Sequence, residues 1–181
     1  MRPKLSRFAA AAALICALTS SAGAQDAPAP QASPLPIPPE HRVSTHHTIA
    51  LRSGELAYTA TAGTLLVRDA NEQPIGSFFY VAYTKDRENR TPRPLTFLYN
   101  GGPGSSTMWL HMGSLGPKRV LTPDGEVTRP APYALVDNPE TLLDRSDLVF
   151  VDAMGTGYSR IAGKGTGKMF YGIDEDGAAF T

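Results

Sequence analysis

The fold of this chain is decided by residues 94–106, PLTFLYNGGPGSS. The first half is a short apolar run of the kind that forms a buried strand. The second half follows at once, and its glycines let the backbone turn sharply and bring an N–H group close to a bound oxygen atom. A tight structural turn is the alternative, because glycine and proline occur in most loops. A second apolar run, DLVFVD, covers residues 147–152.

Strand-like segments rich in β-branched and aromatic residues precede this stretch. They cover residues 48–51, 55–61, 64–68 and 75–84. Gly54, Gly63 and the polar cluster 69–72 separate them, so the spacing predicts an antiparallel meander with a hairpin turn at Gly63. We also expect a helix to begin within residues 107–112.

The amino terminus predicts an export signal over residues 1–24. Basic residues precede an apolar run over residues 8–18, and small residues at 22–24 offer a cleavage site. That run is shorter than the roughly 20 residues of a spanning helix, so we expect no membrane association after cleavage. A periplasmic or secreted location follows. Residues 25–46 are predicted to be a proline-rich linker, and residues 47–181 the folded domain.

Composition excludes several classes of protein. The 181 residues include 17 basic and 17 acidic side chains, for a net charge of +0, which argues against a nucleic-acid binder. Cys16 is the single cysteine and lies in the predicted signal, so a disulfide, a cysteine-based zinc site and a cysteine nucleophile are not expected. The four histidines have no metal-ligand spacing, and adjacent His46 and His47 should face opposite sides of a strand. No metal and no cofactor are predicted, and the oligomeric state is left open.

Two motifs resemble known sites but lack an essential residue. Residues 163–168, GKGTGK, lack the first glycine and the final Ser or Thr of a phosphate-binding loop. Residues 157–161, GYSRI, lack the last glycine of a nucleophile elbow, so Ser159 is not favoured as a nucleophile.

Five blocks in the same order and spacing resemble the serine carboxypeptidase family of carboxypeptidase Y-like peptidases. They are FLYNGGPGSS at 97–106, LGP at 115–117, NP at 138–139, VFVD at 149–152 and GTGYS at 155–159. Residues 104–106 contain no cysteine, and in this respect the chain resembles the bacterial members of the family. The resemblance implies an α/β architecture. The chain would hold the N-terminal portion of an alpha/beta-hydrolase fold, incomplete, in which antiparallel opening strands lead into a mixed sheet.

The resemblance also assigns roles within the glycine-rich loop. It implies that the N–H group of Gly102 lies in the oxyanion hole, as a glycine-rich loop after an early strand does in such hydrolases. It places Asn100, together with Gly101, in contact with the carboxylate at the C-terminus of a peptide substrate. Pro103 and Gly104, again with Gly101, would hold the shape of the loop.

The resemblance also bears on the residues that border the substrate cleft and on the substrate specificity of the enzyme. Asp152 and residues 157–159 are expected to border the cleft in a mainly structural role. Leu98 stands where the family often has tryptophan, and Ser114 where it often has glutamate. Both positions belong to the carboxylate-recognition network in better-known members, so strict C-terminal specificity is not implied.

Family catalysis implies a serine in a Gly-x-Ser-x-Gly elbow and a histidine oriented by an aspartate. The resemblance implies that residues 174–180 open the helix before this elbow. No such elbow occurs in the 181 residues, so we expect the catalytic Ser, Asp and His beyond Thr181. The prediction is the N-terminal fragment of an exported serine-type carboxypeptidase, which hydrolyses peptides from the C-terminus through an acyl-enzyme and is inactive as a fragment. The alternatives are a complete but non-catalytic peptide-binding domain, or an acyltransferase or esterase of the same family.

Overall fold

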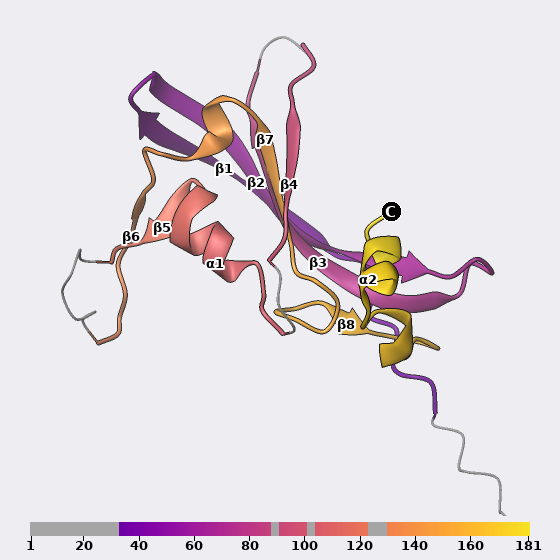
Figure 1. The fold of residues 1–181 in the computed structure, drawn as a ribbon. Helices are drawn as coiled ribbons and strands as arrows, with labels where there is room; N and C mark the ends of the chain where they lie inside the picture. Colours follow the sequence, from indigo (N-terminus) through magenta and orange to yellow (C-terminus); the bar gives the residue numbers. More distant parts are fainter. Residues whose placement is uncertain (1–32, 88–90, 101–103, 123–129) are drawn as a thin grey trace, which may run out of the picture. The chain divides into compact units, whose positions relative to one another are not determined.

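The computed structural model describes residues 33–87, 91–100, 104–122 and 130–181, which form a single unit (Figure 1). Within them a mixed sheet carries most of the structure. The order across the sheet is β1 (Arg42–Leu51), β2 (Gly54–Arg68), β3 (Pro74–Lys85), β7 (Asp147–Val151) and β4 (Leu95–Leu98). A short sixth strand, β8 (Arg160–Ile161), pairs with β3. β1 begins inside the range 25–46 that the sequence analysis assigns to the linker.

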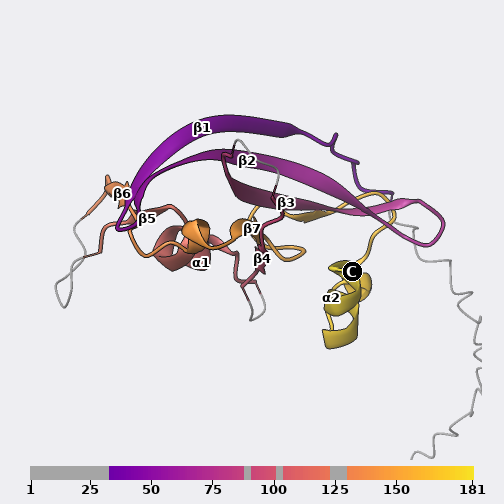
Figure 2. The same cartoon turned by 90° about the horizontal axis from the view of Figure 1, so that it is seen from above.

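The opening strands form the expected antiparallel meander. β1 pairs with β2 over its whole length, and β2 pairs with β3 with one irregularity at Val67 and Arg68. The reversals fall at Arg52–Ser53 and at residues 69–73, where Asp69 Oδ1 accepts two backbone N–H groups at 2.9 Å. Figure 2 shows these strands as a long curved ribbon with α1 (Met108–Leu110) on its inner side.

The hairpin turn predicted at Gly63 is wrong, because β2 runs without interruption through that residue. Gly63 lies opposite Tyr80 in the sheet. A Cβ atom at Gly63 would be 2.9 Å from Tyr80 Oη and 2.8 Å from the His41 carbonyl oxygen. The glycine is therefore explained by close approach of its neighbours, a use that glycine shares with turns.

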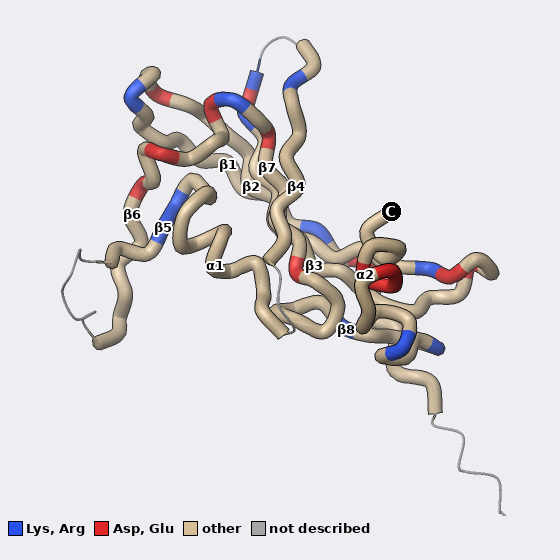
Figure 3. Tube along the Cα trace, in the orientation of Figure 1, with Lys and Arg blue, Asp and Glu red and all other residues tan. Residues whose placement is uncertain are grey.

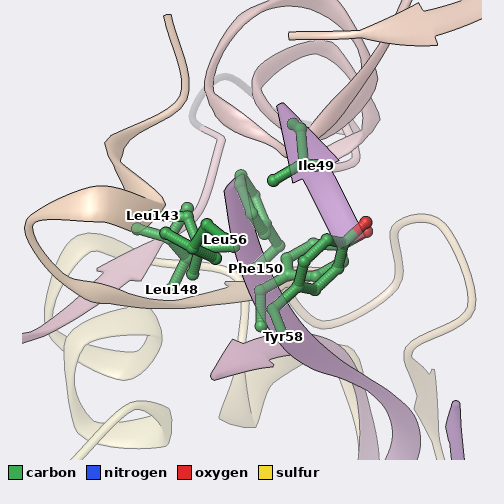
Figure 4. Packing of buried hydrophobic residues seen from close by; sticks show 7 residues of the cluster. Ile49, Leu56, Tyr58, Leu143, Leu148 and Phe150 are labelled. Carbon is green, nitrogen blue, oxygen red and sulfur yellow. The ribbon is translucent and has the colours of Figure 1, made fainter. Parts of the chain in front are cut away.

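A hydrophobic core lies between the sheet and the segments that cross one of its faces. Its centre includes Leu143 and Leu148, which are fully buried, and Tyr58, Ile49 and Phe150 (Figure 4). Leu143 belongs to the 3-10 helix η2 (Leu142–Asp144). Leu110 of α1 and Leu115 of the π-helix η1 (His111–Leu115) also pack against this core, so the expected helix after the glycine-rich loop is confirmed.

A second, smaller core lies near the carboxyl end of the described chain. It joins Ile75 and Phe78 of β3 to Met154 and Phe170. The 3-10 helix η3 (Gly167–Met169) and α2 (Ile173–Ala179) follow, and the helix expected within 174–180 is thereby confirmed. Phe180 stacks on Phe78 with ring centroids 4.9 Å apart.

The charged residues and the small second sheet lie outside these cores. β5 (Lys118–Val120) and β6 (Leu135–Asp137) form a two-stranded antiparallel sheet. Acidic and basic residues are spread along the trace, mostly at turns and strand ends (Figure 3). No helix in the described part of the chain is long and apolar enough to cross a membrane.

The pairing of β7 decides where the functional loops meet. β7 is antiparallel to β3 but parallel to β4, with Leu98 opposite Phe150. The sheet is thus mixed, and few helices accompany it in the described residues. This agrees with the expected part of an alpha/beta-hydrolase domain. Because parallel strands end at the same edge of a sheet, the loops after β4 and after β7 begin side by side.

Candidate functional site

The site begins with the glycine-rich loop after β4. Gly101, Gly102 and Pro103, the centre of the predicted oxyanion loop, lie outside the described residues, so their roles stay predictions. Gly104 has φ +85°, a left-handed conformation that favours glycine. Asn100 Nδ2 donates to Ser105 Oγ at 2.5 Å and to the Ser106 carbonyl oxygen at 3.2 Å. The Asn100 side chain therefore ties the start of the loop to its end.

The second part of the site is the carboxylate of Asp152, directly after β7. Asp152 is 8% exposed, and each of its oxygens accepts a backbone N–H group. Thr107 N donates to Oδ1 at 2.9 Å, and Tyr158 N donates to Oδ2 at 3.0 Å. Thr107 is also buried, and its Oγ1 donates to the carbonyl oxygen of Val151. Asp152 thus connects the glycine-rich loop to the loop that follows β7.

Gly157 makes room for this carboxylate. Its φ is +48°, in the left-handed region, and a Cβ atom built on it would lie 1.8 Å from Asp152 Oδ2. A side chain at this position is excluded both by the backbone conformation and by the carboxylate. The Gly-Thr-Gly-Tyr-Ser block therefore has a packing reason for its second glycine.

Ser159 is a buried structural serine in this arrangement. It is fully buried, its Oγ donates to the Asp152 carbonyl oxygen at 2.6 Å, and it accepts the N–H group of Phe79 at 2.8 Å. Both hydrogen-bonding roles of the hydroxyl are therefore used inside the protein. This agrees with the sequence analysis, which does not favour Ser159 as a nucleophile.

The remaining two motif blocks meet in a separate cluster. Asn138 Nδ2 donates to the carbonyl oxygens of Ser114 and Gly116, the latter at 2.8 Å. The Asn138 N–H group donates to the Pro117 carbonyl oxygen at 2.9 Å. These contacts hold the end of η1 against the segment that leads into η2, which explains why the blocks at 115–117 and 138–139 occur together.

A cleft of about 560 Å³ lies beside the Asp152 contacts. Apolar side chains form much of its lining, among them Phe79 and Val81 of β3, Met108 of α1 and Phe150 of β7. Tyr158 borders it and is 74% exposed. Mostly apolar walls with a few polar groups are typical of sites for small organic ligands or peptide side chains.

His111 is the one histidine that lines this cleft. Its Nε2 is 2.5 Å from Tyr83 Oη, and its ring stacks on Phe150 with centroids 4.7 Å apart. Burial lowers the pKa of His111 to about 4, although the nearby Asp152 carboxylate opposes this shift. Burial also raises the pKa of Tyr83 above its ordinary value. Both groups are therefore neutral at pH 7, and the direction of their hydrogen bond depends on the histidine tautomer.

Sequence reasoning missed the role of His111. It considered this histidine only as a metal ligand, although a single polar residue within the apolar stretch MWLHM was a signal for a buried hydrogen bond. His46 and His47 make separate contacts, to Thr59 and Thr45. Over residues 33–87, 91–100, 104–122 and 130–181, no three His, Cys, Asp or Glu side chains gather into a metal site.

A family model described as serine carboxypeptidase matches residues 54–172. Two curated relatives are the pheromone-processing carboxypeptidase KEX1 of Saccharomyces cerevisiae, strains ATCC 204508 / S288c and JAY291. Each is 34% identical to this chain over 105 residues, which is 56% of this chain and 13% of the relative. The chain therefore matches a small part of the length of these relatives.

Proposed function

The chain belongs to the serine carboxypeptidase family, a family of hydrolases that act on peptides, and from that membership we propose that it is the N-terminal part of an exported serine-type carboxypeptidase. The complete enzyme hydrolyses peptides from the C-terminus through an acyl-enzyme. Within it, the loop after β4 supplies the Gly102 N–H group to the oxyanion hole, and Asn100, beside Gly101, binds the terminal carboxylate. The predicted signal over residues 1–24 directs the protein to the periplasm or the medium.

One observation carries this proposal: the loops after β4 and β7 are joined at the same edge of the sheet. Asp152 accepts N–H groups from both loops, next to a cleft with mostly apolar walls. An oxyanion donor has to be fixed before the reaction, because it stabilises charge that forms only in the transition state. A loop held at a sheet edge by a buried carboxylate meets that requirement.

The chemistry that we propose follows the general serine-hydrolase sequence. A serine hydroxyl attacks the carbonyl carbon of the last peptide bond while a histidine accepts its proton. The carbonyl oxygen becomes an oxyanion, and the Gly102 N–H group donates to it. The tetrahedral intermediate collapses to an acyl-enzyme as the C-terminal amino acid leaves with the proton from histidine. Water then hydrolyses the ester and regenerates the serine.

We propose that the serine, the histidine and their aspartate belong to a longer protein that includes this chain. Two facts support this assignment. The 181 residues hold no Gly-x-Ser-x-Gly sequence, and the chain matches only 13% of the length of its KEX1 relatives. Ser159, which comes nearest to such a sequence, has its hydroxyl occupied inside the fold. The isolated chain should therefore be inactive.

An esterase or acyltransferase of the same family is a second candidate, and a specific observation favours it. Ser114 stands where the family often has glutamate, and its Oγ donates to the Leu110 carbonyl oxygen at 3.3 Å within the helix. Leu98, which stands where tryptophan is frequent, packs against the main core. Neither side chain adds a charged or long-range partner for a substrate carboxylate.

The test uses the full-length protein purified from its own cells. Its intact mass is measured first, because a mass well above the 19.3 kDa of this chain is expected. Labelling by a fluorophosphonate then reports an activated serine. Three matched substrates are compared: a blocked dipeptide acid and its amide, followed by release of the last residue, and its ester, followed by release of the alcohol. A carboxypeptidase prefers the acid, whereas an esterase or acyltransferase turns over the ester.

Asn100→Ala separates carboxylate binding from a general defect. We expect KM for the dipeptide acid to rise with little change for the amide, because the variant removes a contact to the terminal carboxylate. Asn71→Ala, in the exposed turn between β2 and β3, is the matched control and should leave both values unchanged. A protein that is not labelled, hydrolyses none of the substrates and has the mass of the chain without its signal would refute the enzyme proposal and favour a non-catalytic peptide-binding domain.

A further inference from the structure

We propose that Asp152 is a positioning residue for catalysis, which sets the geometry of the glycine-rich loop by holding the Thr107 and Tyr158 N–H groups on its two oxygens. This inference rests on the proposed function of that loop. It assigns to a side chain outside the loop the task of fixing where the loop ends.

Both ends of the loop are attached to the same strand. On the entry side, Leu98 pairs with Phe150 in the parallel register of β4 and β7. On the exit side, Thr107 N donates to Asp152 Oδ1, and Thr107 Oγ1 donates to the Val151 carbonyl oxygen. Residue 98 is therefore anchored at Phe150 of β7, and residue 107 at Asp152, directly after the end of β7. The span that the loop must bridge is set by β7, and Asp152 is the exit anchor.

The anchored residue also controls the segments on either side of it. The Thr107 carbonyl oxygen accepts the N–H groups of Leu110 and His111 at 3.0 and 2.9 Å, so the same residue begins α1. Ser105 and Ser106, just before it, hold the Asn100 amide. A shift of Thr107 would therefore move the helix start and the Asn100 side chain together.

The Asp152 residue is held by several neighbours, which makes it a rigid anchor. Gly157 lies so close to Oδ2 that a Cβ atom would overlap it. Ser159 binds the Asp152 carbonyl oxygen and the N–H group of Phe79, which ties the loop after β7 to β3. Thr107, Asp152 and Ser159 are all buried, so water does not replace these hydrogen bonds.

An amide cannot replace this carboxylate without moving a loop. Asp152→Asn keeps the shape of the side chain, but one oxygen becomes an NH₂ group that faces a backbone N–H donor. One of the two N–H groups then loses its acceptor, either in the buried contact to Thr107 or in the part-buried contact to Tyr158. We expect the donors of the loop to be displaced, which lowers kcat by about 10- to 100-fold and leaves KM within about twofold.

The test compares Asp152→Asn, just after the end of β7, with a matched change at the start of β7 in the full-length protein. Asp147, at the opposite end of β7, is equally buried and accepts Lys85 N and Arg93 Nε, each at 3.1 Å. Asp147→Asn should lower thermal stability but leave kcat unchanged when both variants are assayed below their melting temperatures. Inhibition by an aryl boronate, which mimics the tetrahedral intermediate, should weaken in parallel with kcat for Asp152→Asn only.

A readout that does not need activity keeps the inference separate from the proposed function. Hydrogen exchange of the peptide that spans residues 98–110 should rise in Asp152→Asn and stay at the wild-type level in Asp147→Asn. If Asp152→Asn does not fold, Thr107→Val removes the hydroxyl anchor and should give the same kcat-selective loss and faster exchange to a smaller extent. Unchanged exchange and unchanged kcat in a folded variant would overturn the inference. A wild-type protein without activity, but with the expected exchange, would refute the proposed catalysis and leave the anchor standing.

Discussion

Acidification should destabilise the fold through His111, because its ring is held neutral by burial. The ordinary histidine pKa is about 6.5, and burial lowers that of His111 to about 4. The unfolded chain therefore binds a proton that the folded protein excludes. The stabilisation is full above about pH 6.5 and is lost progressively as the pH falls toward about 4. From about pH 7.5 to about pH 5 the expected loss is about 2 kcal/mol of unfolding free energy.

The surroundings of His111 give the reason for this direction. Tyr83 of β3 is neutral and shares one hydrogen bond with Nε2, and Phe150 of β7 covers one face of the ring. Asp152 is the charged group that acts on the ring, and it favours the protonated form without overcoming burial. Protonation of His111 would therefore place a positive charge beside two aromatic rings at the edge of the cleft, where water solvates it poorly.

Urea unfolding of the full-length protein at several pH values checks the magnitude. His111→Gln removes the titrating group, so its stability should depend less on pH, by about 2 kcal/mol over the same range. The variant also loses the stacking on Phe150. This loss lowers the free energy of unfolding equally at every pH, so it cancels when the pH dependences of the two proteins are compared. His47→Gln, an exposed residue of β1, is the matched control and should keep the wild-type dependence. Parallel pH curves for wild type and His111→Gln would refute the argument.

Three other changes test the packing of the domain. Leu143→Ala should cost about 2–5 kcal/mol of unfolding free energy, because Leu143 is fully buried at the centre of the main core; denaturant unfolding measures this, and a loss below 1 kcal/mol would contradict it. Arg93→Leu leaves the buried Asp147 without its closest cation and should cost about 3–5 kcal/mol, whereas Arg52→Leu, which breaks an exposed ion pair, should cost at most about 1 kcal/mol. Residues 25–181 produced as a separate piece should be poorly soluble or partly molten, because β4 is an edge strand of the described sheet and carries exposed apolar side chains; a cooperative thermal melt of a soluble monomer would count against this.

The sequence alone was sufficient wherever the signal is local. The apolar run at 95–98 and the glycine-rich stretch after it predict a strand followed by a loop, and that strand is β4. The prediction that this strand is buried is wrong for the described residues, because β4 lies at the edge of the sheet with Leu95 and Phe97 exposed. The run at 147–152 predicts β7 in the same way. The motif blocks also indicate the family, because their order and spacing are properties of the chain itself. The family model then confirms that resemblance.

Prediction from the sequence failed where the role of a residue depends on a contact with a residue far away in the chain. Gly63 was predicted to form a turn, but its missing Cβ makes room for Tyr80 and the His41 carbonyl oxygen. His111 was considered only as a metal ligand, because its partner Tyr83 lies 28 positions away in the chain. In both cases the deciding contact is made by a strand that folds back from elsewhere.

Asp152 shows most clearly which properties follow from the sequence and which depend on the tertiary structure. The sequence determined that an acidic residue follows an apolar strand and precedes a glycine-rich block, and the family resemblance implied that this residue borders the cleft. Only the tertiary structure decided that the two oxygens hold Thr107 and Tyr158, because a hydrogen bond between residues 45 positions apart depends on which strands pair and in which register. Local chemistry fixes what a residue can do, and the parallel pairing of β4 with β7 decides which groups it meets.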